Sequence, residues 1–262
     1  MTATRCAASL IPGLRLSSVA EQSELESLIV LKASDSEVLL NGDGMKLYNH
    51  VAPRVQHLLI FDPPWDRMLE FECNSSDNIL AFCDGRRAGD VVRLFGPPTW
   101  VFTWDCVSCW YTPNRPLQRA KYAFWYGDIE WFNPDAQRIP GAERRPRLVS
   151  NTRSTYLFVP KPGRALADVY SEPITKLHQS GHNHGKPIDW MAALIGCCAR
   201  PGDIVLDPFA GGGASLQAAR INSMSWVGCE IEVDRAIEIA SLPHPIRNQS
   251  ATGDLFAEES TP

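Results

Sequence analysis

The stretch "DIVLDPFAGGGASLQAA", Asp203–Ala219, carries the pattern that decides the fold. Its short apolar run predicts a buried strand that ends at Asp207. Three glycines follow, Gly211–Gly213, and glycine permits positive φ and close approach of a ligand to the backbone. The residues from Ala214 onward predict a helix, whose first turn offers N–H groups without intrahelical partners. This order of residues predicts a strand, a tight turn and a helix, with a ligand-binding site at the turn.

A second strand, "WVGCE", follows this helix and ends in Glu230. Glu230 lies 23 residues after Asp207 (230 − 207). In nucleotide-binding α/β folds, an acidic residue about 20 residues past the glycine loop holds a ribose diol. The plainer alternative is a βαβ unit with a glycine-rich corner and no ligand. The combined pattern favours a nucleotide-type site.

The stretch "LLIFDPPW", residues 58–65, places an acid after another apolar run. The two prolines cannot continue a ladder, so the predicted strand ends near Asp62. A carboxylate just beyond a buried parallel strand lies where open α/β sheets bind ligands. The simpler interpretation is a turn, because Asp-Pro is common in turns.

The rest of the chain indicates one α/β domain with an insertion. Strand-like and helix-like pieces alternate in residues 37–105 and again in 181–242, which predicts a parallel sheet. Residues 106–180 differ in character, because they are rich in aromatic residues, Pro and Arg and lack long amphipathic helices, which indicates an insertion. Residues 1–36 stay unassigned, and 243–262 read as a tail.

Composition excludes several classes of protein. The chain has 262 residues, and 44% of them are hydrophobic, as in ordinary globular proteins. Its net charge of -5 means that the molecule as a whole does not attract nucleic acid or acidic lipid electrostatically. It contains no apolar stretch of membrane-spanning length, and its N-terminus does not resemble a secretory signal. The eight cysteines are expected to be reduced thiols of a cytosolic protein. Cys106 and Cys109 form a CxxC without a second pair, so no metal is expected.

Two motifs together carry a family resemblance. Asp62-Pro63-Pro64-Trp65, followed late in the chain by Asp207–Gly213, resembles the S-adenosylmethionine-dependent amino-methyltransferases that modify DNA bases. The catalytic motif comes before the cofactor loop, which is similar to the circularly permuted β class. "LLNGDG" and "HGKPIDWMAALI" are similar to two further elements of that family. The resemblance implies a Rossmann-like methyltransferase fold, a mostly parallel twisted sheet with helices on both faces. It also implies that residues 106–180 are an inserted target-recognition segment.

The resemblance also implies roles for individual residues. S-adenosylmethionine is the implied cofactor, and a metal is not required, because the methyl donor is a sulfonium. The implied cofactor-binding residues are Asp43, Lys186, Pro187, Asp207, Phe209, Gly211, Gly213 and Glu230. The implied catalytic residues are Asp62, Pro63, Pro64 and Trp65.

The catalytic tetrad has a chemical rationale. An exocyclic amino group is a poor nucleophile, because its lone pair is delocalised into the base. The Asp62 carboxylate and the Pro63 carbonyl are two acceptors that draw its N–H bonds toward a tetrahedral geometry. The prolines fix φ and remove competing donors. Trp65 offers a flat surface on which an extruded base stacks.

A basic run within the insertion is the expected contact with DNA phosphates. It could equally be a solvated loop, since charge runs often are. Its members are Arg138, Arg144, Arg145, Arg147 and Arg153.

The resemblance implies methyl transfer to double-stranded DNA by a cytoplasmic, bacterial or phage-encoded enzyme of restriction–modification type. N6 of adenine is the expected target, because an Asp at the head of the tetrad is usual for adenine enzymes. Alternatives are an N4-cytosine enzyme, an RNA adenine methyltransferase, a non-catalytic nucleic-acid-binding subunit, and a dinucleotide-dependent oxidoreductase. A homodimer is left open.

Overall fold

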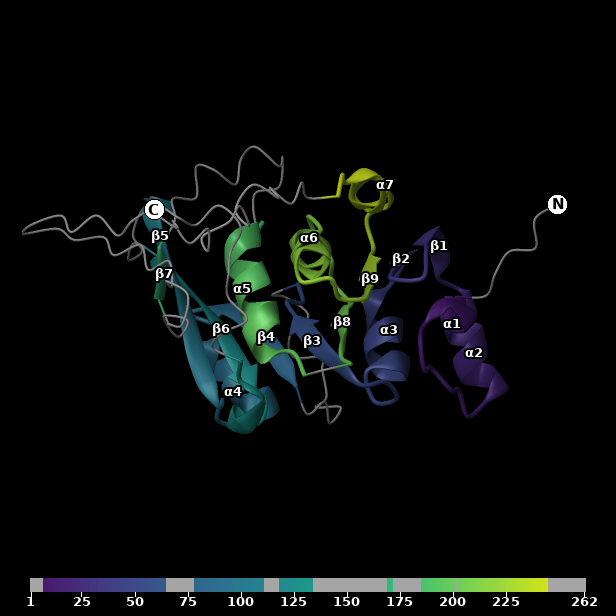
Figure 1. Ribbon diagram of the computed structural model, residues 1–262, viewed down its shortest axis with the longest axis horizontal. Coiled ribbons are helices and arrows are strands. Elements are labelled where there is room, and N and C mark those ends of the chain that lie inside the picture. The colour runs from purple at the N-terminus through teal and green to yellow at the C-terminus, as the bar shows by residue number, and fades with distance from the viewer. Residues whose placement is uncertain are drawn as a thin grey trace, which may run out of the picture.

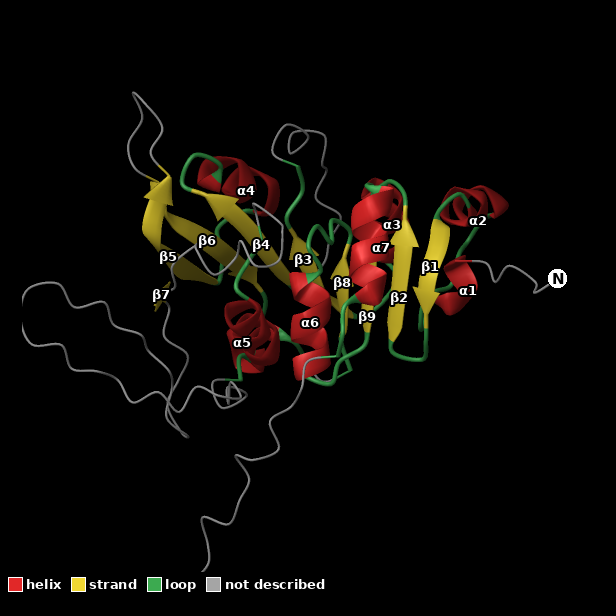
Figure 2. Ribbon diagram, turned by 90° about the horizontal axis from the view of Figure 1, so that it is seen from above, coloured by secondary structure: helices red, strands yellow, loops and turns green. Residues whose placement is uncertain are grey.

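The computed structural model describes residues 7–64, 78–110, 118–133, 169–171, 185–200 and 202–244. Within these ranges the chain forms one nine-stranded sheet with helices on both faces (Figures 1 and 2). The predicted α/β architecture is therefore confirmed.

The strands follow one another across the sheet in the order β1-β2-β9-β8-β3-β4-β6-β5-β7. Their bounds are β1 Ile29–Ala33, β2 Glu37–Asn41, β3 His57–Phe61, β4 Ile79–Asp84, β5 Trp100–Trp110, β6 Gln118–Tyr126, β7 Val169–Ser171, β8 Ile204–Asp207 and β9 Trp226–Glu230. The five central strands, β2, β9, β8, β3 and β4, all run parallel. On either side of them the pairing becomes antiparallel, where β1 pairs with β2 and β6 pairs with both β4 and β5. The edge strand β7 pairs parallel with β5.

The helices divide between the two faces of the sheet. Their bounds are α1 Ala7–Leu10, α2 Val19–Glu26, α3 Gly44–Val51, α4 Ala88–Phe95, α5 Ile188–Cys198, α6 Ala214–Ile221 and α7 Val233–Ser241, with a short 3-10 helix at Ile129–Trp131. Helices α5, α6 and α7 lie on one face, and α1 to α4 lie on the other (Figure 1).

The central strands are apolar because both of their faces are covered. All five residues of β3, "HLLIF", are buried. Leu58 and Ile60 belong to the core under α5 and α6, whereas Leu59 and Phe61 belong to the core over α3 and α4. This alternation follows from the two-residue period of a strand, and it fixes which side chains can reach the site.

The chain order creates a switch point between β3 and β8. From β3 the chain continues to β4 on one side, and from β8 it continues to β9 on the other. Open parallel sheets bind ligands beyond the carboxyl ends of their strands at such a point. Asp62 follows β3 and Asp207 ends β8, so the two acids flank the crevice.

Two regions differ from what the sequence pattern indicates. The pattern assigns no elements to residues 1–36, yet the structure places α1, α2 and β1 there. The boundary expected after residue 105 falls inside β5, and β6 returns beside it, so the sheet extends through residue 126. The remainder of the proposed insertion lies almost wholly outside the described residues.

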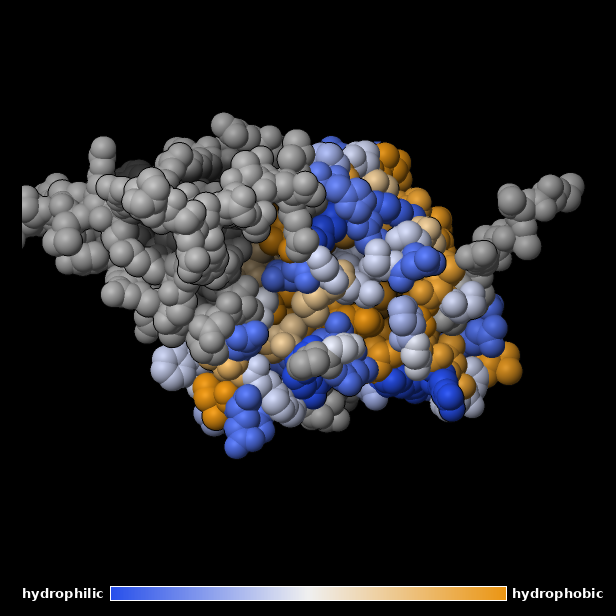
Figure 3. All heavy atoms as spheres, in the orientation of Figure 1, coloured by the Kyte–Doolittle hydropathy of each residue, from blue (hydrophilic) through white to orange (hydrophobic). Residues whose placement is uncertain are grey.

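No helix in the described ranges has the length and apolarity needed to cross a membrane. On the face drawn in Figure 3, hydrophilic and hydrophobic side chains are interspersed over the described surface.

Candidate active site

The glycine loop after β8 is held by backbone and carboxylate contacts. Gly213 is the N-cap of α6 and has φ 75°, a left-handed conformation that glycine adopts without penalty. The Ala210 N–H donates to the Cys229 carbonyl at 2.9 Å. The Gly211 N–H donates to Glu230 Oε2 at 2.8 Å. Glu230 therefore fixes the loop at the end of the neighbouring strand.

Asp207 is a buried carboxylate at the base of this loop. It accepts hydrogen bonds from the Ser215 hydroxyl and, at 3.0 Å, from the Phe209 N–H. Trp226 Nε1 in turn donates to the Ser215 hydroxyl oxygen at 3.0 Å. Burial raises the pKa of Asp207 to about 7, against the lowering effect of these hydrogen bonds. The network ties the loop to the first turn of α6.

Asp43 lies at the same edge of the sheet, after β2. It caps α3, since its Oδ1 accepts from the Met45 N–H at 3.0 Å. The next residue, Gly44, packs directly on the loop after β8: a Cβ there would lie 1.8 Å from the Pro208 carbonyl oxygen. The start of α3 and the glycine loop are thus in backbone contact.

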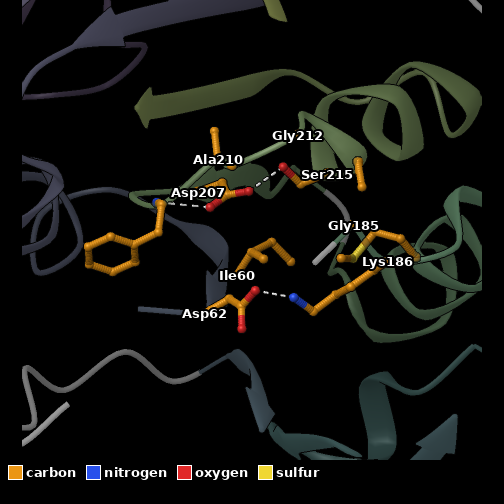
Figure 4. Close-up of a pocket in the computed structure, with 12 residues that line it drawn as sticks. Ile60, Asp62, Gly185, Lys186, Asp207, Ala210, Gly212 and Ser215 are labelled. Carbon is orange, nitrogen blue, oxygen red and sulfur yellow. Dashed lines mark hydrogen bonds and ion pairs between the residues drawn. The ribbon is translucent and has the colours of Figure 1, made fainter. Parts of the chain in front are cut away.

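Asp62 and Lys186 form an ion pair across the crevice. Figure 4 shows the two side chains pointing toward each other, with the Asp207–Ser215 pair on the other side of Ile60. Lys186 comes from the segment before α5, whose N-cap is Pro187. Its ammonium also lies 4.7 Å from the centre of the Phe82 ring. The carboxylate after β3 is therefore held from the opposite side of the crevice.

A first cavity of about 350 Å³ opens between the glycine loop and this ion pair. Asp62 and Lys186 border it on one side, and Asp207 and Ser215 on the other (Figure 4). Among the described residues, its lining is Ile60, Asp62, Gly185, Lys186, Met191, Asp207, Phe209, Ala210, Gly211, Gly212, Ala214 and Ser215. The loop residues that line the cavity mostly have small side chains, so the loop backbone is accessible from the cavity.

A second cavity of about 240 Å³ adjoins the same ion pair. Asp62 and Lys186 line both cavities, so the ion pair stands where the two meet. The other described residues that line it are Phe82, Cys83, Trp104, Lys121, Tyr122 and Trp190. Burial, followed by the nearby Asp84 and Asp62 carboxylates, raises the pKa of the Cys83 thiol to about 12. That thiol stays protonated at neutral pH and is no nucleophile.

The structure brings most of the predicted site residues to one edge of the sheet. Asp62, Lys186, Asp207, Phe209 and Gly211 line the first cavity. Asp43, Gly213, Glu230, Pro63, Pro64 and Pro187 do not line it, but adjoin or hold the segments that do. Trp65 and all five predicted arginines, Arg138, Arg144, Arg145, Arg147 and Arg153, lie outside the described residues.

Sequence reasoning missed the second cavity with its Lys121, and the role of Ser215 in the first cavity. Lys121 sits in an aromatic strand, "KYAFWY", that reads as packing. Its only signal is a lysine in an otherwise apolar run. Nothing in the sequence marks Ser215 as a site residue, because its hydrogen bond to Asp207 is visible only in the structure. The five free cysteines in the described part, Cys83, Cys106, Cys197, Cys198 and Cys229, are all buried, as expected of reduced thiols. Cys109 has no described side chain, so it stays a prediction that the CxxC holds no metal.

The chain belongs to the DNA methylase family N6_N4_Mtase, whose model matches residues 98–240, more than half of its length. The match includes the glycine loop and Glu230 but begins after Asp62. The oxidoreductase alternative is therefore wrong.

Two relatives show how far the likeness extends. The type II methyltransferase M.HhaII of Haemophilus parahaemolyticus is 32% identical over 156 residues, which is 53% of this chain and 61% of that protein. The type II methyltransferase M.BamHI of Bacillus amyloliquefaciens is 20% identical over 267 residues, covering 87% of this chain and 62% of that protein. The chain thus spans about three fifths of each relative.

Solved structures share the fold at low identity. The M1.HpyAVI–SAM complex has a TM-score of 0.51 at 18% identity and covers 77% of this chain and 96% of that one. The cytosine-N4-specific PvuII DNA methyltransferase has a TM-score of 0.54 at 14% identity, covering 80% of this chain and 88% of that one. The Rossmann-like methyltransferase fold is thereby confirmed.

Proposed function

We propose that this chain transfers a methyl group from S-adenosylmethionine to the exocyclic amino group of a base in double-stranded DNA, with N6 of adenine as the favoured target. One observation carries the proposal. The loop that would hold the methyl donor and the carboxylate that would hold the amino group follow adjacent parallel strands, and both line the first cavity. Family membership and the names of the relatives support the reaction class.

The residues present fit the cofactor. The cavity is bordered by small loop residues, Ala210 to Gly212, and by the first turn of α6, whose N–H groups favour a carboxylate. Glu230 is buried beside the loop and is the acceptor expected for the ribose. When bound, S-adenosylmethionine would supply an electrophilic methyl group on a sulfonium. The carboxylates Asp62 and Asp207 are compatible with that positive charge.

Asp62 keeps acceptor capacity despite its ion pair. Lys186 contacts Oδ2, and a carboxylate has about four lone-pair positions, so Oδ1 is left to accept a base N–H. Lys186 then orients the carboxylate and balances its charge. The Pro63 carbonyl is the proposed second acceptor, and Trp65, outside the described residues, the proposed stacking surface. We place the extruded base in the second cavity, whose aromatic walls suit a flat ring.

The Arg138–Arg153 run is the proposed phosphate-contacting element. Because the chain as a whole is acidic, DNA binding must depend on such a local patch. N4 of cytosine remains the alternative target, since the two amino groups are chemically alike. RNA as substrate and a non-catalytic, DNA-binding role also remain alternatives.

A division of labour between two acids tests the proposal. Asp62→Ala is expected to abolish methyl transfer while S-adenosylmethionine binds nearly as in the parent, because the glycine loop is intact. Glu230→Ala is expected to weaken S-adenosylmethionine binding, because it removes both the ribose acceptor and the acceptor of the Gly211 N–H. Asp90→Ala, which removes an α4 carboxylate paired with Arg87 and Arg93, is the matched control.

Calorimetric titration measures binding, and tritiated S-adenosylmethionine with unmodified plasmid DNA measures transfer. Normal transfer by Asp62→Ala, or loss of cofactor binding in that variant alone, would contradict the assigned roles.

A further inference from the structure

Among the described residues, Lys121 is the one cation that lines the second cavity without lining the first. It lies on β6, directly opposite Asp84 on β4 and Trp104 on β5. Directly opposed residues of antiparallel strands share a face, so Lys121 projects to the side of the sheet that α5 covers. Its ammonium lies 5.6 Å from the centre of the Trp104 ring. An ammonium is therefore held against the aromatic wall of the cavity.

This position is costly for a lysine. Burial is the main cause that lowers the pKa of Lys121, and the nearby Lys186 lowers it further, against the raising effects of Cys106, Asp62 and Asp84. The strand around it is otherwise apolar and aromatic, "KYAFWY". A residue such as leucine or methionine would fill the same space without a charge. A partly buried ammonium is stabilised by a polar partner, so we expect such a partner within the cavity.

The expected occupant has such a partner. The ring nitrogen next to the amino group, N1 of adenine or N3 of cytosine, is an acceptor that carries no proton in the neutral base. Asp62 and Lys121 both line the second cavity. A base whose amino group Asp62 holds would therefore present that nitrogen within the reach of the cavity that Lys121 lines. Resting on the proposed function, we infer that Lys121 is a positioning residue that donates a hydrogen bond to this ring nitrogen of the extruded base.

Lys121 is expected to affect binding more than chemistry. A donor on the ring nitrogen draws the amino lone pair further into the ring, which does not make the amino group a better nucleophile. Its contact forms when the base enters and persists into the transition state, and such uniform binding lowers KM without raising kcat. The acceptors that raise reactivity remain Asp62 and the Pro63 carbonyl.

The test compares Lys121→Met, which keeps the stem against Trp104, with Lys121→Arg, which keeps a cationic donor. Transfer from tritiated S-adenosylmethionine to unmodified plasmid DNA is measured against DNA concentration. Lys121→Met is expected to raise KM for DNA roughly 10- to 100-fold, the effect of removing a hydrogen bond from a charged donor, with kcat within about twofold. Lys121→Arg is expected to restore most of that affinity.

Calorimetric binding of S-adenosylmethionine serves as the folding control, because Lys121 does not line the first cavity. If Lys121→Met fails that control, Lys121→Gln replaces it and is expected to raise KM to a smaller extent. A folded variant without the ammonium and with unchanged KM, or with a fall in kcat alone, would overturn the inference. If the parent chain transfers no methyl group to DNA, the proposed function fails first, and the inference fails with it.

Discussion

The contact between Gly44 and Pro208 provides a sharp test of how the cofactor loop is positioned. Gly44→Ala would place a Cβ 1.8 Å from the Pro208 carbonyl oxygen and 2.8 Å from its carbonyl carbon. Real Cβ contacts essentially never fall below 3.0 Å, so the two backbones must separate by about 1.2 Å (3.0 − 1.8). Both atoms belong to backbone, so no side-chain rotation relieves the clash. The loop that begins at Pro208 must therefore move.

Overpacking of this kind costs about 1–3 kcal/mol in the free energy of unfolding. In a chain of this size each kcal/mol corresponds to about 2–4 °C in Tm. A loop displaced by about 1 Å should also bind S-adenosylmethionine at least roughly tenfold more weakly, since the loop backbone lines the cavity. Thermal unfolding and calorimetric titration measure the two effects.

Gly89→Ala is the matched control. Gly89 lies in the first turn of α4, and a Cβ there meets nothing within 4 Å. It is expected to leave Tm unchanged or raise it, because alanine favours a helix by up to about 1 kcal/mol over glycine. If Gly44→Ala and Gly89→Ala have the same Tm and bind S-adenosylmethionine equally well, α3 does not pack as closely on the loop as described.

Two further predictions concern charge. Burial raises the pKa of Asp207 to about 7, from 3.8 ordinarily, so the folded state binds more protons than the unfolded state between these values, and stability falls as pH rises through that window. Asp207→Asn should remove this pH dependence, which amounts to at most about 1.4 kcal/mol per pH unit. Denaturant unfolding of both proteins at pH 5, 6 and 8 measures it. If the free energies of unfolding of parent and variant differ by the same amount at every pH, the prediction is contradicted. Replacing Arg144, Arg145 and Arg147 by alanine should flatten the salt dependence of DNA binding by about one unit of slope for each phosphate that an arginine no longer neutralises. Binding that falls with salt as steeply as in the parent would make the run a solvated loop.

The sequence predicted the parts of the site that are encoded locally. The strand before Asp207, the glycine turn, α6 and the strand ending in Glu230 follow one another within one stretch of chain. The strand before Asp62 was equally clear, because its apolar run ends at two prolines. Each of these is a short pattern with a distinct physical cause.

The interactions that the sequence did not reveal join distant segments. The ion pair between Asp62 and Lys186 spans 124 residues, and the packing of Gly44 on Pro208 depends on the sheet order. Lys121 faces the cavity only because β6 returns antiparallel beside β4. Helix α2 has a single buried residue, Leu25, so its pattern gave no amphipathic signal.

The most direct test of the central claim is the chemical identity of the methylated product. Unmodified DNA is incubated with the protein and methyl-labelled S-adenosylmethionine, then digested to nucleosides and separated, with RNA in a parallel reaction and Asp62→Ala as the inactive control. Label that migrates with N6-methyldeoxyadenosine, and is absent from the control, is the predicted result. Label at N4-methyldeoxycytidine would correct the base but keep the mechanism, whereas label only in RNA, or none with either substrate, would contradict the account.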